Sequence, residues 1–191
     1  MIDGKRAEKV PTIDEIAALV RQRTENFYEA HKLCCSESVA LVLNQGLGGG
    51  LPPEVAVRLG SGFCGGMGDA GCTCGGLSGA VMILGLFLGP GQPGALSKKE
   101  LRKTVKKMHD SFQDRAGSTC CRVLLEKVKH DRKNQRENCM GLTGLGAELA
   151  TSILLEARPD LSGNLDLEFL RGHDSRLGCL VQKVLGLAGK K

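Results

Sequence analysis

Apolar residues recur every three or four positions along most of this 191-residue chain, which is the periodicity of amphipathic α-helices. The clearest example runs from Ile13 to Phe27 and follows a capping box formed by Thr12 and Glu15. With turn residues between its segments, the pattern predicts helices over 13–31, 36–44, 54–62, 74–89, 98–114, 120–130 and 139–158. No stretch alternates apolar and polar residues with period two, so we expect an all-α protein, a compact helical bundle.

The segment 74–89, CGGLSGAVMILGLFLG, differs from the other predicted helices because it is apolar on every side. This composition is typical of a buried helix, and we place it at the centre of the bundle. A loop rich in glycine and cysteine, 60–72, leads into it. Glycine weakens a helix intrinsically, so the missing side chains of Gly75, Gly76 and Gly79 must serve another purpose.

No composition break marks a linker between domains. We expect a cysteine-rich helical domain over 1–158, with a helical extension over 159–191 packed on that same domain. The longest apolar run, 79–89, is shorter than the roughly 20 residues of a membrane-spanning helix. The first twenty residues lack the apolar core of a secretory signal, so we expect a cytoplasmic protein.

Composition narrows the functions to consider. Aromatic residues make up 3% of the chain, with no tryptophan and one tyrosine, which weighs against a β-sandwich and against a base-stacking nucleic-acid platform. The net charge is +5, and the basic residues gather in 98–107 and 127–136. Acidic residues interrupt the basic runs, so we interpret them as solvated surface and do not expect nucleic-acid binding.

The nine cysteines change the picture, because many cysteines in a reducing compartment indicate metal ligation or redox chemistry. Four of them stand at or near the start of a predicted helix: Cys35, Cys74, Cys121 and Cys139. Backbone N–H groups and the helix dipole at such a position stabilise a thiolate. We therefore expect the four sulfurs to converge on one metal centre, with Gly75, Gly76 and Gly79 letting the backbone approach it.

The spacing of the cysteines matches no standard motif. The chain lacks the paired C-x₂₋₄-C of zinc ribbons, the ferredoxin spacings and the C-x-x-C of thioredoxins. Cys179 lies on an apolar helical face and is interpreted as a small buried residue. Which thiols serve as ligands stays open, because four others could replace an assigned one: Cys34, Cys64, Cys72 and Cys120. The histidines are scattered and interpreted as surface residues, and His31 alone lies close to Cys34 in sequence.

Several motifs occur in an order that resembles the redox-active C-GCAxxG-C-C family. They are CCSESV at 34–39, RLGSGFCGGMG at 58–68, TCGGLSGAVMILGL at 73–86, CRVLLE at 121–126 and the helix at Cys139. The resemblance covers roughly 25–157 and implies that the characteristic cysteines of the family are Cys35, Cys74, Cys121 and Cys139. Gly76 stands where the family commonly has alanine. A similar domain in split-Soret cytochromes is associated with an iron–sulfur cluster, which implies a cluster here by analogy.

These observations favour a redox protein that holds an iron–sulfur cluster, of the [2Fe–2S] type, and passes single electrons to a partner protein. One alternative is a thiol–disulfide or sulfur-handling enzyme that uses Cys72 with Cys74, or Cys64 with one of them. Another is a structural zinc site with four cysteine ligands. An interaction or nucleic-acid module that uses the basic surface is a further alternative, and homodimerisation is left open.

Overall fold

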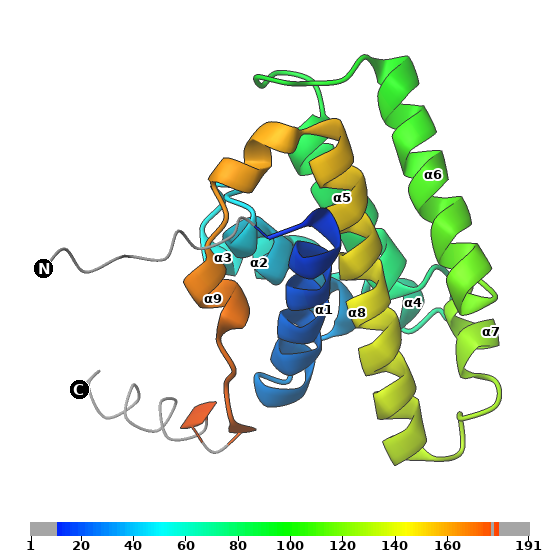
Figure 1. Ribbon diagram of the computed structural model, residues 1–191. Coiled ribbons are helices and arrows are strands. Elements are labelled where there is room, and N and C mark those ends of the chain that lie inside the picture. The colour runs from blue at the N-terminus through cyan, green and yellow to red at the C-terminus, as the bar shows by residue number, and fades with distance from the viewer. Residues whose placement is uncertain (1–10, 177, 180–191) are drawn as a thin grey trace, which may run out of the picture.

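The computed structural model describes residues 11–176 and 178–179, and the described part of the chain is helical without a β-strand (Figure 1). The helices are α1 (Ile13–Ala30), α2 (Cys35–Gly46), α3 (Pro53–Ser61), α4 (Cys64–Met67), α5 (Gly75–Leu88), α6 (Lys98–Ala116), α7 (Cys121–Leu125), α8 (Arg132–Ala157), the 3₁₀-helix η1 (Pro159–Gly163) and α9 (Leu167–Arg171). An isolated β-bridge joins Thr73 to Cys120. The all-α prediction is confirmed.

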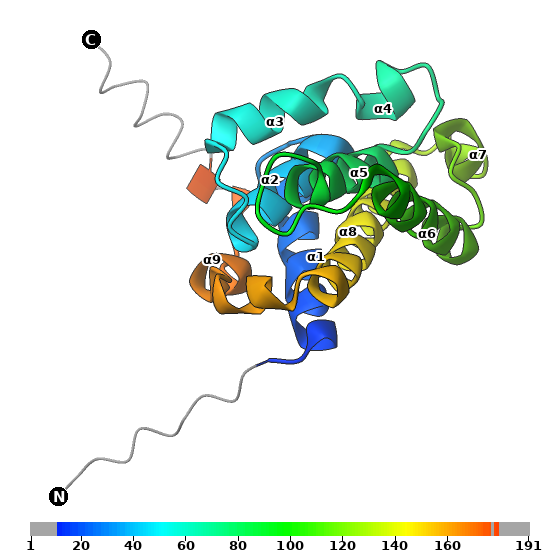
Figure 2. The same ribbon diagram turned by 90° about the horizontal axis from the view of Figure 1, so that it is seen from above.

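Helix α5 lies at the centre of the bundle, packed against α2, α6 and α8 (Figure 2). Its buried side chains, among them Leu77, Leu84 and Leu88, join an aliphatic core to which α1, α2 and α8 also contribute. One side of α5 is open to solvent at Gly85. The segment that is apolar on every side is therefore the central helix of the fold, as the sequence predicts.

Glycines bring α5 close to its neighbours. A Cβ atom on Gly76 would lie 2.6 Å from the carbonyl oxygen of Leu142 in α8, and a Cβ on Gly146 would overlap the carbonyl oxygen of Gly76. On the other side, a Cβ on Gly79 would lie 3.0 Å from the backbone of Ser36 in α2. The backbones of these helices can approach so closely because side chains are missing at the crossings.

The start of α8 differs from the prediction. The helix begins at Arg132, whereas the sequence placed a polar loop over 130–138 and a helix start at Cys139. Asp131 caps the helix by accepting hydrogen bonds from the backbone N–H groups of Lys133 and Asn134. The first two turns are polar all round, so they carry no apolar periodicity. The helix predicted over 120–130 is also shorter, because α7 ends at Leu125.

Residues 159–171 pack onto the bundle, with η1 against α8 and with α9 against α1 and α2. Leu170 of α9 fills the space beside Gly46 of α2, where a Cβ would lie 2.5 Å from it. The guanidinium of Arg23 lies 4.5 Å from the ring centre of Phe27 and 4.9 Å from that of Phe169. Of the helical extension expected over 159–191, residue 177 and residues 180–191 lie outside the described part of the chain.

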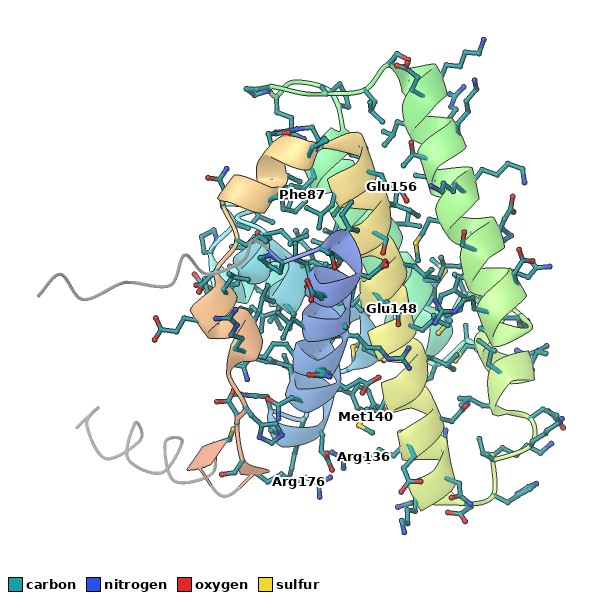
Figure 3. All side chains as sticks on the ribbon, in the orientation of Figure 1. Phe87, Arg136, Met140, Glu148, Glu156 and Arg176 are labelled. Carbon is teal, nitrogen blue, oxygen red and sulfur yellow. A yellow bond between two sulfur atoms is a disulfide. The ribbon has the colours of Figure 1, made fainter. Side chains whose placement is uncertain are left out.

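A charged contact joins three helices on the outside of the bundle. Glu148, which is labelled on α8 in Figure 3, accepts hydrogen bonds from Arg21 of α1, at 2.6 Å, and from Arg115 of α6, at 2.9 Å. None of the helices in the described part of the chain is both long and apolar enough to cross a membrane.

Candidate metal centre

A cavity of about 240 Å³ is lined by the four cysteines that the sequence singles out: Cys35, Cys74, Cys121 and Cys139. Leucine side chains form much of its wall: Leu33, Leu124, Leu125 and Leu142. Tyr28, Lys32 and Gln135 contribute polar groups, and Cys34 also borders the cavity. We call this cavity the four-cysteine pocket. It gathers thiols from segments that lie up to about a hundred residues apart in the sequence.

Two of the cysteines stand at helix starts that face each other. Cys35 is the first residue of α2 and Cys74 is the N-cap of α5. A Cβ atom on Gly75 would overlap the sulfur of Cys35. The glycine that follows Cys74 therefore leaves the space that the Cys35 thiol occupies, as a close approach of backbone to sulfur requires.

Backbone hydrogen bonds join the two segments that carry Cys74 and Cys121. The N–H of Cys74 donates to the carbonyl oxygen of Thr119 at 2.8 Å, and the N–H of Cys121 donates to that of Cys72 at 2.5 Å. The two short segments 71–74 and 119–122 thus run antiparallel around the β-bridge. Nothing in the local sequence pattern indicates this contact, because it joins residues nearly fifty positions apart.

The glycine-rich loop packs onto the same place. Gly65 and Gly66 in α4 have φ values of +62° and +73°, which L-residues with a side chain rarely adopt. A Cβ on Gly66 would lie 2.7 Å both from Cβ of Cys121 and from the backbone nitrogen of Cys72. Gly65 itself lines the four-cysteine pocket. The loop needs glycine here for its backbone conformation and for its contact with Cys121.

Cys139 reaches the pocket in a different way from the prediction. It lies in the interior of α8, two turns after the helix begins at Arg132. Free N–H groups of a helix start are therefore not available to its thiol. The hydroxyl of Tyr28 in α1 interacts with the Cys139 sulfur instead. Cys139 therefore lines the pocket, but not from the helix start at which the sequence placed it.

Burial raises the pKa of all four thiols. The pKa of Cys74 rises to about 12 and that of Cys139 to about 11, through burial first and then through repulsion between neighbouring thiolates. Burial also raises the pKa of Cys35 and of Cys121. Backbone N–H groups of Gly76 and Leu77 oppose the shift at Cys74, but they do not outweigh burial. The thiols of the metal-free pocket are therefore protonated near pH 7, contrary to the low pKa that the helix start suggested for Cys74.

The four sulfurs are spread more widely than a single tetrahedral ion requires. A zinc ion with bonds of about 2.3 Å holds its four sulfurs about 3.8 Å apart. Within the described residues, the one set of three candidate ligands with donor atoms all within 4.8 Å of each other is Cys34, Glu37 and Cys64. No three of the pocket cysteines meet that limit.

The other cysteines lie outside the four-cysteine set. Cys34 and Cys64 form a disulfide. Cys64 is therefore not paired with Cys72 or Cys74, which is the pairing that the thiol–disulfide enzyme alternative considered. Cys72 is an exposed free thiol, and Cys120 donates to the carbonyl oxygen of Gly71. Cys179 is buried with its sulfur 3.5 Å from Nε2 of His31.

Three other candidate residues do not line the pocket: His31, Gly76 and Gly79. His31 interacts with Asp174 at 2.8 Å and stacks on Phe27. Gly76 turns its Cα toward α8, although its N–H group lies near the Cys74 sulfur. Gly79 packs on α2 and does not line the cavity. Of the three glycines, Gly75 alone borders it.

Comparison with known proteins gives one family. No curated protein and no solved structure matches the chain. A family profile described as "Putative redox-active protein (C_GCAxxG_C_C)" matches residues 33–153, a range that includes all four cysteines of the pocket. The pocket cysteines and this match, which covers more than half of the sequence, place the chain in the redox-active C_GCAxxG_C_C family.

Proposed function

We propose that Cys35, Cys74, Cys121 and Cys139 hold a [2Fe–2S] cluster and that the protein exchanges single electrons with a partner protein. The observation that carries this proposal is the convergence of four cysteines, from four separate segments, on one cavity. Four cysteine thiolates are the usual ligand set of such clusters. A cluster, when bound, would supply a one-electron redox couple.

The spacing of the four sulfurs supports a cluster over a single zinc ion, and the pKa values of the thiols support a metal centre over a reactive-thiol enzyme. The sulfurs are too widely spread for one tetrahedral ion without rearrangement, whereas a two-iron centre needs more room between its ligands. The raised pKa values mean that the thiols need a nearby cation to become thiolates. A reactive-thiol enzyme needs the opposite, a lowered thiol pKa.

The surrounding residues would orient and tune the ligands. Backbone N–H groups of Ser36, Gly65 and Gly75 favour the thiolate form of Cys35. Hydrogen bonds to ligand sulfurs and exclusion of water both set the potential of such a centre. The leucines of the pocket wall, such as Leu124 and Leu142, would keep water from the sulfurs.

The test is metal and sulfide analysis of the full chain. The protein is purified without oxygen, reconstituted with iron and sulfide, and examined by absorption spectroscopy. We expect a brown protein with two irons and two acid-labile sulfides per chain, as the cluster formula requires, and with absorption that dithionite bleaches. A colourless protein with one tightly bound zinc would overturn the proposal in favour of a structural site. A protein that takes up neither metal would overturn both.

A further inference from the structure

A disulfide lies beside the four-cysteine pocket and uses none of the four cysteines that would hold the cluster. It joins Cys34, the N-cap of α2, to Cys64, the first residue of α4, with the Cα atoms 5.8 Å apart. Both residues are partly exposed. The other seven cysteines of the chain are free thiols.

Each half of the disulfide adjoins a residue of the pocket. Cys34 lines the cavity and precedes Cys35. Cys64 precedes Gly65, which also lines the cavity and directs its N–H group toward the Cys35 sulfur. The disulfide therefore fastens the glycine-rich loop to the start of α2, next to one of the four thiols.

The core does not depend on this bond. Ser36 donates to the carbonyl oxygen of Gly60 at 2.7 Å, and Gly60 packs directly on the backbone of Glu37. These contacts hold α3 on α2 whether or not the disulfide is present. Helix α4, in contrast, has four residues, and two of them are glycines with left-handed backbone. Cleaving the bond would remove the covalent link between α4 and α2 and loosen α4, while Gly66 still packs against Cys121 and the bundle stays folded.

The reduced thiols would also have a partner. The hydroxyl oxygen of Ser36 lies 3.5 Å from the sulfur of Cys34 and 3.7 Å from that of Cys64. Its own proton is donated to Gly60, so the oxygen is free to accept a hydrogen bond from a thiol. The buried serine hydroxyl is therefore placed to serve the dithiol form.

We propose that Cys34 and Cys64 form a second redox site, a two-electron thiol–disulfide couple whose reductant is a dithiol. A thiolate of the reductant attacks the Cys64 sulfur and forms a mixed disulfide, while the bond to Cys34 breaks. The electron pair passes to the Cys34 sulfur, which takes a proton from water. The second thiolate of the reductant displaces the Cys64 sulfur, which is protonated in turn, and the reductant leaves as its own disulfide. The step requires no cluster in the pocket, so this proposal and the cluster proposal can fail separately.

The test counts thiols in metal-free, full-length protein poised with graded ratios of reduced and oxidised dithiothreitol, without denaturant. After quenching and unfolding, free thiols are alkylated and counted by mass spectrometry. We expect seven modified cysteines at the oxidising end and a gain of two at the reducing end, with an unchanged helical circular dichroism spectrum. A peptide that links residues 34 and 64 should disappear in step, and amides of 63–68 should exchange faster.

Two variants make the result specific. Cys72→Ser removes an exposed free thiol and should lower the count by one at both ends while keeping the gain of two. Cys34→Ser should abolish the gain. A bond that resists the reductant until the protein is unfolded would overturn the proposal, as would nine free thiols at every poise or loss of the fold on reduction.

Discussion

The first residue of α5, Gly75, occupies the position where any side chain would overlap the sulfur of Cys35 in α2. The two helices begin against each other, and the missing Cβ is what allows a thiol to lie between them. Gly75 is therefore required both for the position of the Cys35 thiol and for the close packing of α5 on α2.

The Gly75→Ala variant is expected to lose most of its metal loading. The added methyl group must displace the Cys35 sulfur or push the helices apart, and such overpacking costs about 1–3 kcal/mol. Iron content after reconstitution and the urea midpoint measure the two effects. Gly85→Ala is the matched control, because Gly85 lies in the same helix with nothing within 4 Å of its added Cβ. That variant should load fully and gain about 0.5–1 kcal/mol of stability; equal loading of the two variants would contradict the role given to Gly75.

The crossing of α5 and α8 gives a second prediction, on stability alone. A methyl group in Gly146→Ala would overlap the carbonyl oxygen of Gly76, so the free energy of unfolding should fall by about 1–3 kcal/mol. Gly141→Ala, in the same helix but with open space around the added Cβ, should be neutral or stabilising. Denaturant unfolding of both variants decides the matter. A stable Gly146→Ala protein would mean that the two helices separate easily.

Single cysteine substitutions test the ligand assignment. Cys139→Ser should abolish the cluster absorption, because removing one of four thiolates leaves an incomplete ligand set. Cys72→Ser and Cys179→Ser should retain it, since the first thiol is exposed and the second lies beside His31. Iron, sulfide and the visible spectrum are measured for all three proteins. Loss of the cluster in Cys179→Ser would refute the assignment.

Local sequence patterns predicted most of the helices but not how their ends meet. The capping box at Thr12 marks a real helix start, and Gly65 of the glycine-rich segment before α5 lines the pocket. The antiparallel contact between 71–74 and 119–122 depends on hydrogen bonds across a long loop, and periodicity carries no information about such pairing.

Two features of the cysteines escaped prediction for different reasons. The start of α8 is polar on every face, so no apolar stripe marks Arg132 as its first residue. Cys139 consequently looked like a helix-start residue. The Cys34–Cys64 pairing depends on how the loop after α3 turns back over α2, and sequence alone does not determine which cysteines pair.

Substitution of Tyr28 is predicted to change the midpoint potential of the cluster and not the amount of cluster bound. The interaction of its hydroxyl with the Cys139 thiol opposes the rise in pKa of that thiol, and so favours the more negative form of a ligand. Tyr28→Phe keeps the ring but removes this hydroxyl. We expect normal cluster content and a midpoint potential lower by about 40 mV, which corresponds to one hydrogen bond of about 1 kcal/mol in a one-electron couple. Potentiometric titration of both proteins measures the difference, and an unchanged potential would show that the hydroxyl does not act on the cluster.

The lowered pKa of Glu148 leads to a prediction of how the free energy of unfolding depends on pH. Burial opposes its ionisation, but hydrogen bonds from Arg21 and Arg115 outweigh burial and lower its pKa. The folded protein therefore holds this group ionised more strongly than the unfolded chain does, so its contribution is present at neutral pH and is lost as pH falls through the lowered value. Glu148→Gln should cost about 1 kcal/mol at pH 7, with the difference from the parent protein shrinking below about pH 4. Urea midpoints of the parent protein and the variant at pH 7 and below about pH 4 measure this difference.

Glu137→Gln is the control, because it breaks an exposed pair with Lys133 at 3.9 Å in the same helix. It should lower the free energy of unfolding at pH 7 by less than Glu148→Gln does. Equal losses in the two variants would argue that the contact of Glu148 with α1 and α6 does not stabilise the fold.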